Sequence, residues 1–110
     1  MKYNRTISKE KYRIMLTIEE IKRAVTKVGK KYGIKNAYLF GSYAKKTANE
    51  ESDVDILIDR GSIRGYLQLN GFRLDLSDEL GTDVDVVTTG GASESFLSRI
   101  NPNRILLYGA

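Results

Sequence analysis

A strand that carries carboxylates limits what this chain can fold into more than any other feature. The segment SDVDILID, residues 52–59, is rich in β-branched residues and predicts a β-strand, yet it holds Asp53, Asp55 and Asp59. An unpaired carboxylate in a buried strand is costly. Because side chains alternate along a strand, Asp53 and Asp55 share the face opposite Val54. We therefore expect one face to pack in the core and the other to hold two carboxylates about 7 Å apart.

The segment before it predicts a phosphate-binding turn. NAYLF, residues 36–40, is a short apolar run that ends at Gly41 and Ser42, as a buried strand entering a tight turn does, and a helical turn is expected from Tyr43. Glycine lets backbone N–H groups approach an anion, a helix start adds partial positive charge, and a serine hydroxyl can donate to a phosphate oxygen. The P-loop pattern G-x-x-x-x-G-K-[ST] does not occur in the sequence.

The other segments predict an α/β (α+β) fold. Thr17 and Glu20 form a T-x-x-E capping box at the start of an amphipathic helix that Gly33 ends. Further predicted elements are a helix over 63–80, a strand over 82–89, a helix over 93–99 and a last strand over 104–108. The helix over 63–80 is predicted from the spacing of Ile63, Tyr66, Leu67, Leu74, Leu76 and Leu80. This order predicts a small mixed sheet flanked by helices.

Length and composition predict one domain. The chain has 110 residues, 41% of them hydrophobic, which suffices for one compact core. We divide it into a basic N-terminal arm, residues 1–16, and a domain over residues 17–110. No run of about 18 apolar residues is present to span a membrane, and the N-terminus lacks the apolar centre of a signal peptide. The expected location is the cytoplasm.

The absence of histidine and cysteine narrows the chemistry. It excludes thiolate and imidazole metal sites, histidine bases and cysteine nucleophiles, so any metal must be a hard cation held by oxygen. Residues 1–46 hold 13 Lys and Arg against 3 acids, whereas residues 47–110 hold 5 against 11. A basic face beside an acidic patch suits a polyanion next to a divalent metal, but lysines that only cover solvated helix faces would give the same count.

A third carboxylate is predicted to join the first two. Asp85 lies in VDVV, residues 84–87, and if this strand neighbours the strand of Asp55, it faces the same pocket. Three convergent carboxylates repel one another, and their pKa values rise unless divalent cations bind. Asp83, two residues earlier on the same face, is the alternative to Asp85. Asp59 is interpreted as a solvated strand end.

The spacing of these residues resembles a known family. Gly41 and Ser42, ten intervening residues and then the D-x-D of Asp53 and Asp55 resemble the signature of the nucleotidyltransferases of the DNA polymerase beta superfamily. Within that group the chain resembles the minimal nucleotidyltransferases (MNT), the single-domain type often encoded beside a HEPN protein as antitoxin to its toxin. The likeness runs from about Thr17 to Tyr108.

The resemblance implies roles for the site residues. It implies the polymerase-beta-like fold, with two Mg²⁺ ions and ATP as substrate. The implied metal-binding and catalytic residues are Asp53, Asp55 and Asp85, and the implied nucleotide-binding residues are Gly41, Ser42 and Lys45. By this reading Asp85 assists deprotonation of the acceptor hydroxyl. Members commonly carry Arg-Gly where this chain has Lys45 and Lys46, and lysine keeps the charge but loses the bidentate fork.

Two functions of different class follow from the resemblance. In the first, the protein moves a nucleoside monophosphate, AMP from ATP, onto a hydroxyl of a partner protein, a HEPN toxin. In the second, it is a catalytically weak or inactive protein of the same fold that acts by binding, as an antitoxin or scaffold. A nucleic-acid-binding module ranks last because it rests on charge alone. Larger relatives close a second domain over the nucleotide, so a partner protein or a second copy in a homodimer is expected to supply the far wall here.

Overall fold

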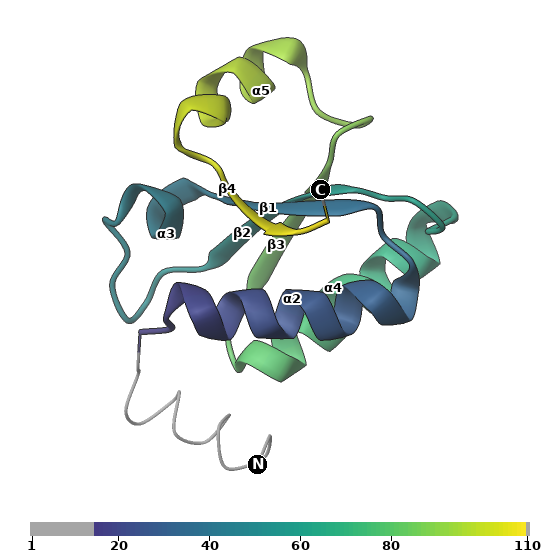
Figure 1. Ribbon diagram of the computed structural model, residues 1–110, viewed down its shortest axis with the longest axis horizontal. Coiled ribbons are helices and arrows are strands. Elements are labelled where there is room, and N and C mark those ends of the chain that lie inside the picture. The colour runs from purple at the N-terminus through teal and green to yellow at the C-terminus, as the bar shows by residue number, and fades with distance from the viewer. Residues whose placement is uncertain (1–14, 110) are drawn as a thin grey trace.

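The computed structural model describes residues 15–109 and shows a four-stranded sheet between helices (Figure 1). The helices are α2 (Ile18–Tyr32), α3 (Gly41–Lys45), α4 (Gly65–Leu80), α5 (Glu94–Ile100) and the 3-10 helix η1 (Asn101–Asn103). The strands are β1 (Asn36–Phe40), β2 (Val54–Asp59), β3 (Val84–Thr88) and β4 (Ile105–Tyr108). This order of elements confirms the predicted fold class.

The sheet is mixed, with the strand order β3-β2-β1-β4. β1 pairs antiparallel with β2 and with β4, whereas β2 and β3 run parallel. A parallel pair requires a crossover, and α4 supplies it between β2 and β3. Within residues 15–109, β3 and β4 are therefore the edge strands.

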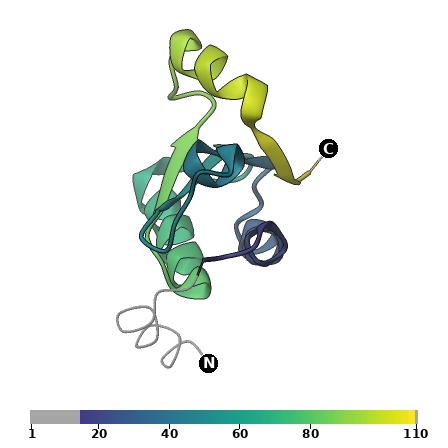
Figure 2. The ribbon, with the colours of Figure 1, turned by 90° about the vertical axis from the view of Figure 1, so that its left-hand side faces the viewer.

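Helices cover both faces of the sheet (Figure 2). α2 and α4 lie side by side on one face, and α5 lies on the other. The larger core cluster is on the α2 and α4 side and includes Ile56, Ile58 and Phe72. The smaller cluster, on the α5 side, has Phe40, Leu57 and Ile100 at its centre. Since both faces of β2 meet apolar partners, β2 is the most enclosed strand of the sheet.

The N-terminal side of the domain begins earlier than the sequence indicated. Of the arm predicted over residues 1–16, residues 1–14 lie outside the described part of the chain. Leu16 is buried in the larger core cluster, and its backbone N–H donates to the Tyr43 hydroxyl at 3.2 Å. The described packing therefore starts just before α2.

The capping box that begins α2 is present. The Thr17 side chain accepts from the backbone N–H of Glu20 at 3.0 Å, and the Glu20 carboxylate accepts from the Thr17 N–H at 2.9 Å. Gly33 ends the helix in the left-handed region with φ at +70°. These contacts satisfy backbone groups that have no partner inside the helix.

We expect Thr17→Ala to lower the free energy of unfolding by about 1 kcal/mol, because the Glu20 N–H loses its acceptor. The thermal midpoint should fall by roughly 5 °C, a shift that differential scanning calorimetry resolves. An unchanged midpoint would mean that solvent replaces the cap without loss.

The helix predicted over 63–80 is correct in place, and Leu76 and Leu80 are buried as predicted, but the other four side chains assigned to it are not on its buried face. It begins at Gly65, so Ile63 is buried in the loop before it. Tyr66, Leu67 and Leu74 are 79%, 87% and 51% exposed. The buried residues of α4 are Phe72, Leu76 and Leu80, which recur at four-residue spacing on the side that faces the sheet and α2.

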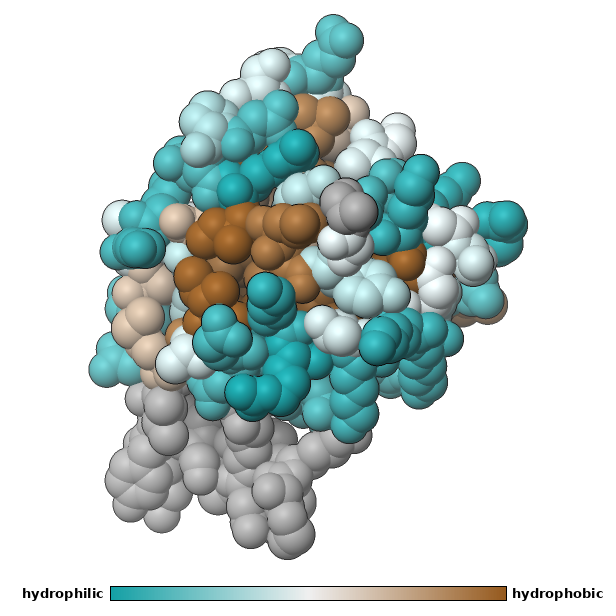
Figure 3. Space-filling model, in the orientation of Figure 1, coloured by the Kyte–Doolittle hydropathy of each residue, from teal (hydrophilic) through white to brown (hydrophobic). Residues whose placement is uncertain are grey.

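Apolar surface is also visible from the side shown in Figure 1. It gathers between β4 and α2 (Figure 3), and Leu106 of β4 is 43% exposed. Within residues 15–109, no helix combines the length and the apolar character needed to cross a bilayer.

Candidate active site

Strand pairing places the predicted carboxylates together. Phe40 of β1 is the register partner of Asp55 on β2, and Asp55 is the register partner of Asp85 on β3. Partners in adjacent strands project to the same face of a sheet, so Asp55 and Asp85 lie side by side on the α5 face. Asp53 comes just before β2 and, by the two-residue period, belongs to this side too. We call Asp53, Asp55 and Asp85 the acid row.

The acid row is electrostatically strained. Asp55 is partly buried, and this burial raises the pKa of its carboxyl from 3.8 to about 6, with further increases from the negative charges of Asp85 and then Asp53. The order of these causes shows that the position of Asp55 in an enclosed strand matters more than either neighbour. Asp53 and Asp85 are exposed. A cation bound among these oxygens would lower the energy of the charged form.

Asp83 and Asp59, the two aspartates outside the acid row that the sequence analysis discussed, have different surroundings. Asp83 lies before β3 and is exposed, and its carbonyl oxygen accepts from the Val54 N–H at 3.1 Å. Asp59 is not the solvated strand end that the sequence indicated. It is partly buried, and its carboxylate accepts hydrogen bonds from the Thr89 hydroxyl at 2.9 Å and from the Asn36 amide at 3.4 Å. Asp59 therefore joins three segments at the far end of β2.

Gly41 packs against the acid row. Its φ is +73°, and a Cβ atom there would overlap with Asp55 Oδ2 and lie 2.9 Å from Asp55 Cγ. The sequence predicted a glycine that lets backbone N–H groups reach an anion. The structure adds a second reason for it, since any side chain at this position would displace the Asp55 carboxylate.

Ser42 and Lys45 extend the site along α3. Ser42 is the second residue of this helix and partly buried, whereas Lys45 is its last residue and exposed. Because α3 has only five residues, its dipole is small. Any contact of α3 with an anion therefore depends on backbone N–H groups, the Ser42 hydroxyl and the Lys45 ammonium.

Lys46 has the backbone conformation of a glycine. Its φ is +63° and its ψ is +34°, and its N–H donates to carbonyl oxygens of α3 as a left-handed helix cap does. Within residues 15–109 it is the one non-glycine residue with positive φ. Glycine is the usual residue in such a cap, so the turn has the ordinary shape although the residue is lysine.

Lys46→Gly is expected to raise the free energy of unfolding by about 0.5–1 kcal/mol, because glycine adopts the left-handed region without the Cβ penalty. Lys45→Gly is the matched control: it removes the same side chain from a helical position and should cost about 0.5–1 kcal/mol. Urea denaturation of both variants measures the difference. A loss of stability in Lys46→Gly would contradict the strain assigned to this cap.

The residues that could hold a metal are the acid row. Their donors are carboxylate oxygens, which suit Mg²⁺. Burial first, and then the negative charges of Asp85 and Asp53, raise the pKa of Asp55, and a divalent cation would offset the repulsion among these charges. Their side chains are not gathered into a ligand set, since residues 15–109 contain no group of three or more acids arranged to hold a metal ion.

Surface hollows that include Arg23 and Lys27 lie along α2, on the other face of the sheet from α5.

Comparison with known proteins identifies the family. The model of the family described as polymerase beta, nucleotidyltransferase, matches residues 19–110. The chain belongs to this nucleotidyltransferase family. The match starts in the first turn of α2 and contains the acid row, Gly41 and Ser42.

Curated relatives narrow the family further. The chain is 41% identical over 73 residues to the protein named "Putative protein adenylyltransferase MJ0435" of Methanocaldococcus jannaschii, covering 66% of this chain and 78% of that protein. It is 38% identical over 77 residues to "Protein adenylyltransferase MntA" of Thermococcus cleftensis, again covering 66% of this chain and 78% of that protein. The predicted resemblance to minimal nucleotidyltransferases is therefore confirmed.

Solved structures share the fold. One is a toxin-antitoxin complex with AMP-PNP, with a TM-score of 0.72 and 24% identity, covering 81% of this chain and 73% of that one. Another is the tri-AMPylated HEPN toxin of Shewanella oneidensis in complex with MNT antitoxin, with a TM-score of 0.67 and 21% identity, covering 86% of this chain and 74% of that one. The nucleotidyltransferase fold predicted from the sequence is confirmed.

Proposed function

We propose that this nucleotidyltransferase moves AMP from ATP onto a hydroxyl of a partner protein, a HEPN toxin for which it is the antitoxin. The observation that carries the proposal is the pairing of Asp55 with Asp85 in adjacent strands, beside Gly41, where an added Cβ atom would overlap with the Asp55 carboxylate. Similar proteins support the same acceptor class, since they include protein adenylyltransferases and an MNT antitoxin in complex with a tri-AMPylated HEPN toxin.

The chain's own residues divide the work along the site. Gly41, Ser42 and Lys45 bind the phosphates through backbone N–H groups, a hydroxyl and an ammonium group. The acid row would hold two Mg²⁺ ions, which when bound neutralise phosphate charge and lower the pKa of a coordinated hydroxyl. The proposed metal ligands are the carboxylates of Asp53, Asp55 and Asp85.

In the reaction, the acceptor hydroxyl oxygen forms a bond to the α-phosphorus of ATP, and the bond from that phosphorus to the bridging oxygen of pyrophosphate breaks. The carboxylate of Asp85, at the outer end of the row, takes up the hydroxyl proton or orients the hydroxyl for its loss. Pyrophosphate leaves with the bonding electron pair. The products are an AMP phosphodiester on the partner and pyrophosphate, and no covalent intermediate with this chain forms.

A second candidate is an antitoxin that acts by binding alone. Lys45 and Lys46 favour it, because they replace the Arg-Gly pair of family members and remove a bidentate phosphate contact. The acid row, Gly41 and Ser42 are intact, and this favours the enzyme. In either case Asp53 and Asp85 are exposed, so we infer that the HEPN partner, or a second copy of this chain, covers the nucleotide. We place the protein in the cytoplasm.

Intact-mass spectrometry separates the two candidates. The purified chain is incubated with Mg²⁺, each nucleoside triphosphate in turn and its HEPN partner, and both proteins are then weighed. We expect the partner to gain the mass of one or more AMP groups with ATP. The gain should disappear in Asp53→Ala and persist in Asp83→Asn, which removes an exposed acid outside the row. A stable complex with no gain under any condition would leave binding as the function.

A further inference from the structure

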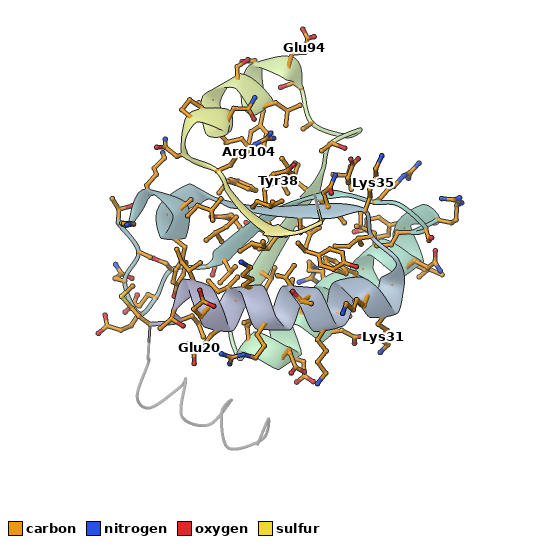
Figure 4. The ribbon with its side chains drawn as sticks, viewed as in Figure 1. Glu20, Lys31, Lys35, Tyr38, Glu94 and Arg104 are labelled. Atoms are coloured by element: carbon orange, nitrogen blue, oxygen red, sulfur yellow. The ribbon has the colours of Figure 1, made fainter. Side chains whose placement is uncertain are left out.

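Two arginines beyond the predicted site are held over aromatic rings. The Arg104 guanidinium carbon lies 4.2 Å from the centre of the Tyr38 ring, and that of Arg99 lies 5.5 Å from the centre of the Phe96 ring. Figure 4 shows Arg104 descending from the segment after η1 toward Tyr38 on β1, in the space between α5 and the sheet. Both arginines are exposed.

Both pairs lie on the face of the sheet that carries the acid row. Phe96 packs edge-on against Phe40 with ring centres 5.5 Å apart, and Phe40 is the register partner of Asp55. Tyr38 is two residues before Phe40, which is about 7 Å along the strand. Tyr38 and Phe96 both pack against the smaller core cluster. The two guanidinium groups therefore lie over the same face of the sheet as the acid row, on the side of β1 and α5.

The arginines have free donors. Within residues 15–109, neither guanidinium has a hydrogen-bond or ion-pair partner, whereas Arg64 and Arg73 donate to nearby oxygens. A guanidinium stacked on a ring loses little of its donor capacity, because its N–H groups point outward in the plane of the group. Stacking also limits its rotamers, so less conformational entropy is lost when it binds a ligand. Such a guanidinium group can bind a carboxylate or a phosphate with little rearrangement.

The charges in the site call for such donors. The acid row and a triphosphate are both strongly negative, and the lysines at the end of α3, Lys45 and Lys46, are point charges rather than forks. We propose that Arg104 and Arg99 bind the polyphosphate of the nucleoside triphosphate and form the wall of the site opposite α3. This inference rests on the proposed function, since it assumes that the triphosphate occupies the acid row.

Titration calorimetry with the full chain and no acceptor protein tests the inference. The ligands are ATP, inorganic tripolyphosphate and adenosine, each with Mg²⁺. Arg104→Gln and Arg99→Gln are each expected to raise the Kd of ATP and of tripolyphosphate about tenfold, as loss of a charge-assisted hydrogen bond does, and to leave adenosine unaffected. Arg60→Gln is the matched control, because Arg60 is exposed just after the far end of β2. This variant should bind all three ligands as the parent protein does.

Tyr38 acts in this scheme as a positioning residue for Arg104. Tyr38→Leu should weaken tripolyphosphate binding by a smaller factor than Arg104→Gln, and Tyr38→Phe should restore it, because phenylalanine keeps the ring face. Thermal midpoints of all variants are measured in parallel, since a purely structural role would lower the midpoint without a selective loss of phosphate affinity.

The inference is overturned if Arg104→Gln and Arg99→Gln bind tripolyphosphate as the parent does, or if ATP and adenosine lose affinity equally. A separate titration with the HEPN partner gives a second check: the inference is also overturned if the variants bind ATP normally and lose only the partner, since the arginines would then bind an acidic protein surface. Because these measurements need no transfer, they separate failure of this inference from failure of the proposed enzyme: the parent can bind tripolyphosphate through both arginines and still transfer nothing.

Discussion

Asp55→Asn is expected to abolish AMP transfer and, at the same time, to make the protein more stable at neutral pH. Asp55 is the central carboxylate of the acid row and the one in contact with Gly41. An amide cannot carry the negative charge that binds Mg²⁺, and a loss of about 4 kcal/mol of transition-state stabilisation corresponds to a rate lower by roughly a thousandfold. Intact-mass time courses with the partner protein measure it.

The stability gain comes from the same carboxylate. Burial raises the pKa of Asp55 from 3.8 to about 6, so the charged form destabilises the folded state at pH 7. Because the side chain is partly exposed, solvent screens this effect, and we expect Asp55→Asn to raise the free energy of unfolding by about 1 kcal/mol. Asp83→Asn, which removes an exposed acid outside the row, is the control.

The pH dependence follows from the sign of the shift. A folded-state pKa above the unfolded one means that the folded protein binds the Asp55 proton more tightly. The destabilisation is fully present above about pH 6 and is relieved as the pH falls from about 6 toward 4. Urea denaturation at pH 7.5 and pH 4.5 should therefore show a large difference between parent and Asp55→Asn at the higher pH and a small one at the lower. Equal differences at both values would place the strain elsewhere.

Gly41→Ala should reduce both stability and transfer, whereas Gly65→Ala should reduce stability alone. Both glycines have φ at +73°, so alanine is strained at either position. At Gly65 nothing lies within 4 Å of the added Cβ, and the cost is about 1 kcal/mol. At Gly41 the Cβ overlaps with the Asp55 carboxylate, which must move, and we expect a further loss of about 1–3 kcal/mol.

The effect of Gly41→Ala on the reaction follows from that displacement. Moving one ligand of the acid row by about 1 Å costs on the order of 100-fold in rate, so transfer should fall by that factor while Gly65→Ala transfers as the parent does. Chemical denaturation and intact-mass rates on the same samples give both quantities. If the two variants lose stability and transfer to the same degree, backbone strain alone explains Gly41 and its contact with Asp55 is without consequence.

Local patterns in the sequence predicted most of the elements because their signals are short-range. The capping box of α2, the apolar run of β1 with its Gly-Ser end and the β-branched run of β2 each depend on neighbouring residues, and each is where it was expected. The family signature placed Asp53 and Asp55 with Gly41 at a fixed spacing. Their assignment as metal and catalytic residues remains a prediction.

Long-range features could not be predicted in the same way. That Asp85 faces Asp55 depends on the parallel pairing of β2 and β3, which the sequence offered only as a condition. The contact of Gly41 with Asp55 follows from the register of β1 on β2, and the hydrogen bonds of Asp59 follow from the loop after β3. Leu74 was assigned to the helix by spacing but faces outward, because α4 has apolar residues on more than one side and tertiary packing decides which are covered.

Asp85 lies on a strand with no neighbour beyond it among residues 15–109, and this decides how a large molecule can come near the reaction. The acid row reaches the edge strand of the sheet. In the proposed reaction, a folded acceptor protein can therefore bring a side chain to Asp85 without unfolding.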